Sequence, residues 1–385
     1  MEFAFTQEQE MIRDTAASFL AEVSDSAAVR RSMATELGYD EALWSRICAE
    51  MYWQAIHIPE AYGGMGLGYV EVVAMMEQMG RYLLCSPFFS TVCLAANALL
   101  LAGDEEQKSQ WLGAICEGSA TATVAFNGGS ARWDADAITA TCRRDGDTYV
   151  LNGEYRYVID GHSADLLIVA VREEGSSGSD GVSLFLLPAD SAGVSRSWLP
   201  TMDQARRQAQ VRLENVSLPA MAVLGGAGNG WPALSTVLDL AAVALAAEQV
   251  GGSAQLLDMT VAYTSERVQF NRTIASFQAV KHKAADMMLS CEVARSAVYY
   301  AACVAQEALA GGDLAAELPE AASVAKSYCS DAYFAVAGDA LQLFGGVGFT
   351  WEYDLHLYFK RAKSSEHLLG NGAWHRERLA ALLLD

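Results

Sequence analysis

Residues 363–372, KSSEHLLGNG, contain one carboxylate, Glu366, at the point where a cationic segment gives way to glycines. The pattern predicts the end of a helix followed by a glycine-containing turn. Loops held on a rigid frame often carry catalytic groups, and a carboxylate in such a loop can act as a general base. Glu366 is therefore the first candidate for chemistry.

A second group of candidates lies in the sequence RVQFNRTIASFQAVKH, residues 267–282. Arg267 offers a planar guanidinium that can bind a phosphate or pyrophosphate through two hydrogen bonds. Phe270 follows one turn later, and Gln278 is placed to open the next helix. Taken alone, Arg267 is better explained as a member of a surface ion pair.

A third group lies in the sequence LQLFGGVGFTWEYDLHLYFKRAK, residues 341–363. Gly345 and Gly346 remove two side chains where another backbone or a flat ligand can approach closely, and Gln342 supplies amide donors and acceptors. Taken alone, the two glycines are better explained as the C-cap of a helix. The two motifs gain weight when they are considered together.

Four other residues are weaker candidates. His367 and His375 are eight residues apart and have no carboxylate or cysteine at ligand spacing, so we predict no metal site. Arg206 and Arg207 could meet an anionic ligand, but a solvated loop is the simpler explanation.

The elements that position these residues are predicted to be helical, then β, then helical. Thr6 and Gln9 form a capping box, and helical periodicity continues with interruptions to about residue 118. Short β-rich runs follow, and long helices resume after residue 224. We therefore predict an α+β fold with an N-terminal helical domain (1–118), a middle antiparallel β domain (119–224) and a C-terminal helix bundle (225–385).

Local signals support this division. The predicted turns of the β domain are Asp145-Gly146, Asn152-Gly153 and the loop EEGSSGSDG at 173–181. A stripe of small and apolar residues at steps of four and three predicts the bundle seam: Val280, Ala284, Met287, Cys291, Ala294 and Val298. Pro319 is placed to start the next helix.

Composition limits the function classes. The net charge of −21 disfavours nucleic acid and anionic membranes as partners, because both repel an acidic surface. The eight cysteines lack CxxC pairing and lie mostly in apolar runs, which predicts reduced core residues of a cytoplasmic protein. We predict no export signal and no transmembrane helix.

The order and spacing of the two motifs, together with the layout, resemble the acyl-CoA dehydrogenase family over essentially the whole chain. In that family, Arg-x-x-Phe and Gln-x-x-Gly-Gly motifs of one subunit hold the pyrophosphate and adenine end of an FAD whose flavin lies in the neighbouring subunit. Asn271 is a departure, because the family usually has glycine after the phenylalanine. The resemblance implies a C-terminal four-helix bundle, and it implies FAD binding by Arg267, Phe270, Gln278, Gln342, Gly345 and Gly346.

The resemblance also implies α,β-dehydrogenation of an acyl-CoA thioester, in which a glutamate removes the α proton. The commoner position of that glutamate, six residues after the R-x-A-K type segment, is occupied here by Leu369. The alternative position, 26 residues before the motif arginine, is occupied by Ala241. Both positions are apolar, and Glu366, Asp239 and Glu248 fall at neither.

The middle domain departs from the family as well. Residues 124–130 read VAFNGGS where the family carries Thr-Glu-Pro, which lines flavin and substrate. Tyr157, Val158 and Ile159 stand where the family has Trp-Ile-Thr, whose threonine bonds the flavin ring. Because Ile159 has no hydroxyl, it offers no hydrogen bond there. This chain's own flavin pocket is therefore altered, whereas the residues that reach a neighbour's FAD are kept.

The simplest interpretation is a subunit without catalytic residues of its own that completes the FAD site of a homologous, glutamate-bearing partner. Such chains resemble subunits of heteromeric acyl-CoA dehydrogenases that act on bulky acyl groups such as steroid side chains. The resemblance thus implies a heterotetramer, an acyl-CoA substrate and an electron-transferring flavoprotein as acceptor. In this interpretation no catalytic residue is assigned, and Glu366 is a solvated helix-end residue rather than an ion-pair partner of Arg361 or Lys363.

Two alternatives stay open. One is an autonomous homo-oligomeric enzyme that uses Glu366 or Asp239 as an unconventional base. The other is a scaffold or interaction protein that keeps the fold and binds no flavin. Retention of Arg267 and the glycine pair argues against the scaffold.

Overall fold

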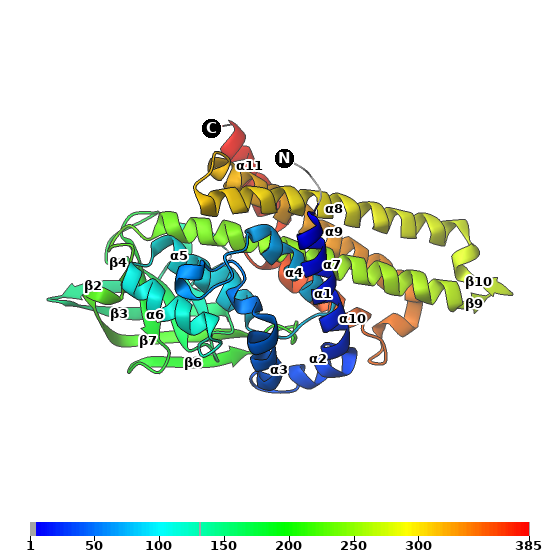
Figure 1. The fold of residues 1–385 in the computed structure, drawn as a ribbon. Coiled ribbons are helices and arrows are strands. Elements are labelled where there is room, and N and C mark those ends of the chain that lie inside the picture. The colour runs from blue at the N-terminus through cyan, green and yellow to red at the C-terminus, as the bar shows by residue number, and fades with distance from the viewer. Residues whose placement is uncertain (1–4, 131, 385) are drawn as a thin grey trace. The chain divides into compact units, whose positions relative to one another are not determined.

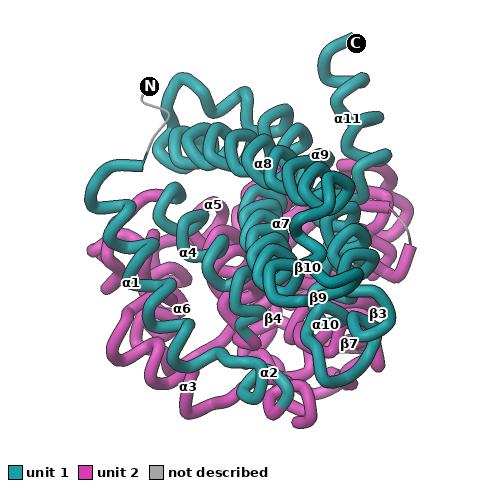
Figure 2. Tube along the Cα trace, turned by 90° about the vertical axis from the view of Figure 1, so that its right-hand side faces the viewer, with its two compact units in different colours: residues 1–30, 69–84, 242–385 teal, residues 31–68, 85–241 magenta. Residues whose placement is uncertain are grey.

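The computed structural model describes residues 5–130 and 132–384 (Figure 1). The chain divides into two compact units, which Figure 2 colours separately. One unit contains residues 1–30, 69–84 and 242–385, and the other contains residues 31–68 and 85–241. Along the chain the elements follow the predicted order of helical, then β, then helical, so the α+β fold is confirmed.

The N-terminal part is helical. In α1 the predicted capping box is present, because Thr6 and Gln9 each accept a hydrogen bond from the other's backbone N–H. The elements of this part are α1 (Gln7–Val23), α2 (Ser26–Met33), α3 (Glu41–Arg46), a π-helical stretch (Ile47–Met51), α4 (Tyr69–Arg81), a second π-helical stretch (Phe89–Ala96), α5 (Asn97–Ala102) and α6 (Glu105–Cys116).

An eight-stranded sheet forms the middle of the chain, in the order β6-β7-β3-β2-β4-β5-β8 with β1 beside β4. Its strands are β1 (Ala122–Ala125), β2 (Thr141–Asp145), β3 (Thr148–Ile159), β4 (Leu166–Glu173), β5 (Val182–Pro188), β6 (Val194–Leu199), β7 (Gln208–Pro219) and β8 (Val223–Leu224). The prediction of an antiparallel sheet is wrong for two pairs, since β1 and β2 both run parallel to β4. Alternation along one strand carries no information about the direction of a neighbour that comes from elsewhere in the chain.

Two of the three predicted turns are present. Asp145 ends β2, and Gly146 with Asp147 connects it to β3, whereas residues 173–181 connect β4 to β5. The turn predicted at Asn152-Gly153 is wrong, because both residues lie within β3 at an irregularity in its pairing with β7. Gly153 is needed there for packing: a Cβ at this position would lie 2.4 Å from the Ala140 Cβ.

The C-terminal part contains five α-helices among the described residues. They are α7 (Trp231–Glu266), α8 (Gln278–Ala310), α9 (Leu318–Phe344), α10 (Leu355–His367) and α11 (Gly372–Leu384). In the predicted stripe of α8, Met287, Cys291, Ala294 and Val298 are buried, which confirms the seam over most of its length. Pro319 lies in the first turn of α9, as predicted.

Helices α4 and α7 cross in close backbone contact. A Cβ at Gly251 would lie 1.7 Å from the Glu77 carbonyl oxygen, and one at Gly80 would lie 2.0 Å from the Glu248 carbonyl oxygen. Only glycine permits so close an approach. This crossing helps to hold the part of α7 that carries Glu248.

Two helical segments are long and apolar enough to cross a membrane by length and composition: α7 and residues 315–349. In the most apolar window of α7, 83% of the residues are buried inside the structure, as expected for a core helix. The eight cysteines are all free thiols, and seven of them are buried, as predicted for reduced core residues.

Candidate functional site

The segment that follows α7 is a short hairpin. Strands β9 (Val268–Gln269) and β10 (Arg272–Thr273) pair in antiparallel register, and Phe270 and Asn271 form the two-residue turn between them. Both turn residues have positive φ, 54° and 63°. Asparagine tolerates this left-handed conformation better than most residues do. Asn271 can therefore occupy this left-handed position, where the resemblance leads us to expect glycine.

The polar and aromatic groups of this hairpin face outward. Phe270 is 85% exposed, and Arg272 stacks on Phe277 with its guanidinium carbon 3.9 Å from the ring centroid. Arg267 is exposed, and its guanidinium has no hydrogen-bond or ion-pair partner among the described residues. The surface ion pair considered for Arg267 is thus not formed within the described chain, so its fork of donors is available to an external anion.

The second motif lies at the end of α9. Gln342 is exposed on the last helical turn, and Gly345 caps the helix with φ 65° and ψ −147°, a conformation that favours glycine. A Cβ added at Gly345 or Gly346 would meet no heavy atom within 4 Å in the described structure. Packing within this chain therefore does not explain the absence of a side chain at Gly346.

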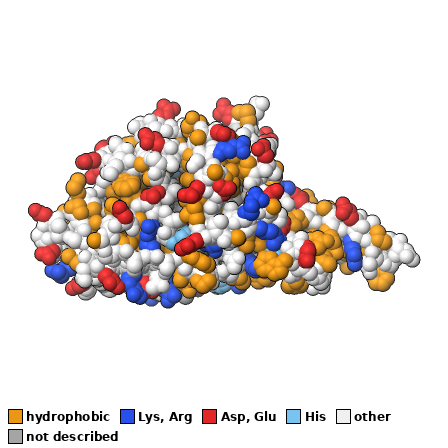
Figure 3. Space-filling model, turned by 90° about the horizontal axis from the view of Figure 1, so that it is seen from below, with side chains coloured by type: hydrophobic (Ala, Val, Ile, Leu, Met, Phe, Trp, Pro, Cys, Tyr) orange, Lys and Arg blue, Asp and Glu red, His pale blue; other side chains and the backbone are white. Residues whose placement is uncertain are grey.

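The two motifs lie at the same end of the C-terminal helices. Tyr263, near the end of α7, stacks on Phe344 at the end of α9 with a centroid distance of 4.0 Å and a hydroxyl-to-carbonyl distance of 3.5 Å. Arg267 immediately follows α7, and Gln278 is the first residue of α8. Figure 1 shows the β9–β10 hairpin at this end, and Figure 3 shows apolar, basic and acidic side chains at the same right-hand end from below. The fold thus gathers all six predicted FAD-binding residues at one exposed end.

Glu366 lies at the end of α10, as predicted, but its carboxylate is ion-paired rather than freely solvated. Its Oε2 is 2.9 Å from Lys363 Nζ, one turn earlier, and its side chain is only 17% exposed. The prediction of a solvated residue is therefore wrong, and the ion pair considered as an alternative is formed. The sequence did not decide between them because both need only local helical geometry.

We expect Glu366→Gln to leave the dehydrogenase activity of the assembled enzyme within a fewfold of wild type. A partly exposed ion pair contributes about 0–1 kcal/mol to stability, whereas loss of a general base costs about 10²-fold to 10⁴-fold in rate. Steady-state turnover at matched flavin content separates these cases. A loss of the larger size would assign Glu366 to catalysis after all.

The two positions where the family places its base are apolar and buried. Leu369 is 5% exposed and Ala241 is fully buried. Neither side chain can accept a proton. Leu369 also has positive φ, 59°, and precedes Gly370, whose φ is 98°. The backbone at position 369 is therefore an unusual turn, although its side chain is an ordinary hydrocarbon.

The carboxylates of α7 are buried. Glu248 Oε1 lies 3.1 Å from Arg361 Nη1, and both side chains are at most 4% exposed. Glu248 is thus committed to a buried ion pair and is no free base. Asp239 is also buried, at 4% exposure.

In the unit that contains the sheet, two segments differ from the family's flavin-binding residues. Both make contacts within this chain. Val158 and Ile159 are buried, Tyr157 is half exposed with φ 60°, and Thr123 Oγ1 donates to the Ile159 carbonyl at 2.7 Å. Asn127, in the segment that replaces Thr-Glu-Pro, accepts from Gly129 N at 2.7 Å and donates to the Arg132 carbonyl at 2.8 Å. This Asx-type turn stabilises the segment locally.

Arg206 and Arg207 are not in a solvated loop, so that prediction is wrong. Both are buried, with Arg206 over the ring of Phe89. Arg207 stacks on Trp198 with 4.5 Å to the centroid and donates to the backbone carbonyl of Met33 at 2.8 Å. Stacking and carbonyl contacts from distant segments bury these cations in spite of their polar sequence neighbours.

One structural residue was missed by the sequence analysis. Lys326 is fully buried on α9, in a stripe of buried residues at helical spacing that comprises Ala322, Lys326, Cys329, Tyr333 and Val336. Burial lowers the pKa of Lys326 to about 7, and nearby acidic groups, among them Glu366 and Asp331, oppose this shift. A lysine inside an apolar stripe was the signal that could have identified it.

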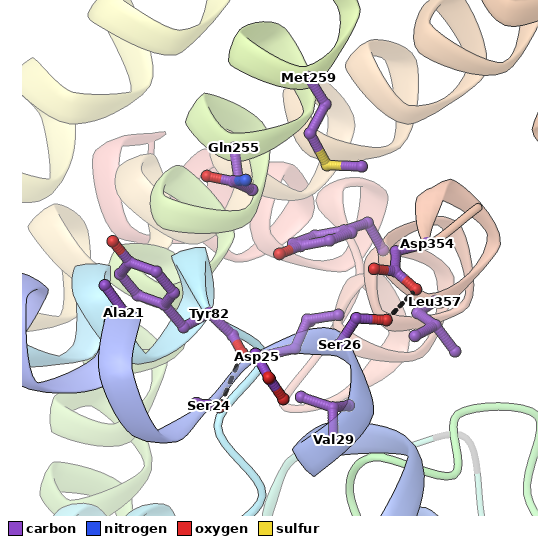
Figure 4. Close-up of a pocket in the computed structure, with 12 residues that line it drawn as sticks. Ala21, Ser24, Asp25, Ser26, Val29, Tyr82, Gln255, Met259, Asp354 and Leu357 are labelled. Atoms are coloured by element: carbon purple, nitrogen blue, oxygen red, sulfur yellow. Dashed lines mark hydrogen bonds between the residues drawn. The ribbon is translucent and has the colours of Figure 1, made fainter. Parts of the chain in front are cut away.

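The unit that contains the C-terminal helices has a pocket of about 230 Å³, lined from α1, α2, α7, α10 and the segment after α4 (Figure 4). At its edge, Asp354 accepts from Ser26 Oγ at 2.7 Å and pairs with Arg30 at 2.7 Å. None of the residues predicted from the sequence as cofactor ligands lines this pocket. The described residues also contain no cluster of three or more potential metal ligands.

Comparison with known proteins agrees with the layout. Residues 6–119, 127–216 and 228–384 match the N-terminal, middle and C-terminal domains of acyl-CoA dehydrogenases. The acyl-CoA dehydrogenase IpdE2 of Mycolicibacterium smegmatis is 33% identical over 98% of this chain and 99% of its own length. The chain belongs to the acyl-CoA dehydrogenase family. Its reaction class is oxidation of a CH–CH bond, and FAD is its cofactor.

Two solved structures of this family have names that denote paired proteins. The ChsE4–ChsE5 complex from Mycobacterium tuberculosis is 26% identical with a TM-score of 0.89, covering 100% of this acyl-CoA dehydrogenase chain and 99% of the other. The Tcur3481–Tcur3483 steroid ACAD is 29% identical with a TM-score of 0.86, covering 98% of each chain.

The exposed end of the C-terminal helices fits an FAD phosphate group. Its donors are charged or amide groups without partners in the described chain, and the space above Gly346 is open. The positions of the base do not fit the family's catalytic chemistry, because they carry hydrocarbons.

Proposed function

We propose that this chain is an FAD-completing subunit of a hetero-oligomeric acyl-CoA dehydrogenase and acts beside a homologous partner that supplies the catalytic glutamate. The observation that supports this proposal is a contrast within one unit. Arg267 is exposed and has no partner among the described residues, whereas Leu369 at the commoner base position is a buried hydrocarbon.

In the proposed site, this chain contributes binding and not proton transfer. Arg267 would pair with the pyrophosphate of the partner's FAD, and the amides of Gln278 and Gln342 would donate to neighbouring polar groups. Gly345 and Gly346 would leave room for the adenine end, and Phe270 would supply an apolar contact. When bound, FAD supplies the acceptor for the hydride that leaves the β carbon of the substrate.

The proposed substrate is an acyl-CoA with a bulky acyl group of the steroid type, and the proposed acceptor is an electron-transferring flavoprotein. The steroid ACAD named above supports the substrate class, and the paired names of both solved structures support a heteromeric assembly. We expect a heterotetramer located in the cytoplasm. We also propose that the domains meet at residues 118 and 224, as the sequence predicts.

The autonomous enzyme is less well supported. Glu366 is paired with Lys363, and Asp239 is buried at 4% exposure. Neither residue lies at a position where the family places its base.

The test is flavin content. The full-length chain is purified alone and, separately, together with a glutamate-bearing acyl-CoA dehydrogenase encoded beside it, and flavin absorbance is measured per chain. We expect the chain alone to be colourless and the complex to hold half the flavin per chain that a homo-oligomeric member holds.

Full flavin occupancy in a homo-oligomer of this chain would contradict the proposal and favour an autonomous enzyme. A complex that forms but stays colourless would contradict it in the other direction and favour a scaffold protein.

A further inference from the structure

The turn between α10 and α11 has a strained backbone. Leu369 and Gly370 are consecutive residues with φ of 59° and 98°. A non-glycine residue adopts this left-handed conformation only at a cost in free energy, so surrounding contacts must stabilise it. At Gly370 a Cβ would lie 2.6 Å from the Trp374 ring, so glycine is required there. The unusual turn is therefore built into the packing of α11.

The buried amine of Lys326 holds this turn from α9. It has four acceptors within hydrogen-bond distance: Ser330 Oγ at 2.7 Å and the backbone carbonyls of Gly370 at 2.9 Å, Ser365 at 3.0 Å and Glu366 at 3.2 Å. The last carbonyls of a helix lack partners within the helix, and a cation near them is favourable. One side chain thus connects the end of α10 to the turn that follows it.

His375 holds the same turn from α11. Its Nε2 lies 3.0 Å from the Leu369 carbonyl oxygen. Because a carbonyl only accepts, Nε2 must carry the proton. Burial and the nearby charge of Lys326 lower the pKa of His375 to about 3, so the ring is neutral near pH 7. The carbonyls of Leu369 and Gly370 therefore each accept a hydrogen bond from a buried donor, His375 and Lys326 respectively.

We propose that Lys326 and His375 are positioning residues that hold position 369 in the left-handed conformation, so that its side chain points in one fixed direction. Leu369 would then be held in one orientation at the position where, by resemblance, the family carries its base. The inference about the conformation of the turn follows from contacts within this chain and does not require bound flavin. Only its relevance to catalysis rests on the proposed function.

The first test is hydrogen exchange of the full-length chain, read on the peptide that covers residues 364–372. Lys326→Met keeps most of the side-chain volume and removes every donor. We expect exchange in this peptide to become about tenfold faster or more, because charged hydrogen bonds to the carbonyls are lost, with little change in peptides from α1. Lys363→Met is the matched control, since Lys363 contacts the Glu366 side chain and not the turn carbonyls.

The second test separates hydrogen bonding from packing at His375. His375→Gln retains an N–H donor, whereas His375→Phe fills the space without one. We expect faster exchange at residues 364–372 in the phenylalanine variant and near-normal exchange in the glutamine variant.

Unchanged exchange in a folded Lys326→Met chain, or equal exchange in the two His375 variants, would overturn the proposal. If Lys326→Met does not fold, the His375 pair alone decides. Neither measurement involves flavin, so a failure here is distinguishable from a failure of the proposed function.

Discussion

Arg267→Ala should cause the assembled complex to lose most of its FAD on dilution. A guanidinium can pair with a pyrophosphate through two charged hydrogen bonds, and the loss of such a contact costs on the order of 2 kcal/mol or more. This corresponds to roughly thirtyfold weaker binding. The chain itself should stay folded, because the Arg267 side chain is exposed and contacts no polar partner among the described residues. Flavin absorbance per chain after gel filtration measures the effect.

Arg272→Ala is the matched control for this experiment. Arg272 lies in the same hairpin, is also exposed, and stacks on Phe277 of its own chain. We expect it to change flavin content little. Unchanged flavin content after Arg267→Ala, or equal losses in the two variants, would contradict the specific role given to Arg267.

Arg361→Met should destabilise this chain by about 3–5 kcal/mol, because it leaves the charge of Glu248 buried without its ion-pair partner. The two side chains are at most 4% exposed and lie 3.1 Å apart. Chemical denaturation followed by circular dichroism, at one fixed protein concentration, measures the change. Adding Glu248→Gln to Arg361→Met should recover a large part of the loss, since the buried negative charge is then removed.

The control for this second prediction is Arg376→Ala. Arg376 pairs with Asp331 at 2.7 Å, but both side chains are more than half exposed. An exposed pair of this kind contributes about 0–1 kcal/mol. If Arg376→Ala and Arg361→Met had similar effects, burial of the Glu248–Arg361 pair would not be the source of its importance.

The predictions for Arg267 and Arg361 concern different properties of the unit that contains the C-terminal helices. The buried pair concerns the stability of the helices themselves, whereas Arg267 concerns what the end of those helices offers to a neighbour. A variant of Arg267 that unfolded the chain, or a variant of Arg361 that removed flavin without loss of stability, would show that this separation is wrong.

Local features of this protein were predictable from the sequence. The Thr6–Gln9 capping box and the helix start at Pro319 depend on residues a few positions apart. The α8 stripe follows from helical periodicity. The FAD motifs were recognised as a family pattern. Their exposure on a hairpin and at a helix end agrees with the proposal that they bind the FAD of a neighbouring subunit.

The side-chain partners of the candidate residues depended on tertiary structure. Glu248 and Arg361 are 113 residues apart, and Lys326 and Gly370 are 44 residues apart. Arg207 is buried because carbonyls from residues more than 170 positions earlier accept its hydrogen bonds. Sequence neighbours carry no signal of such contacts, so the sequence predicted a solvated loop there.

The sequence by itself therefore determined the order of elements, the family and the apolar residues at positions 241 and 369. Only the tertiary structure decided that Glu248 is paired with Arg361, that Asn152-Gly153 is a bulge, and that Leu369 occupies a left-handed turn held by buried donors. The physical reason is the separation along the sequence between the residues that interact. Caps, periodicity and turns are set by interactions within a few residues, whereas burial and the choice of hydrogen-bond partner depend on segments that meet only when the chain folds.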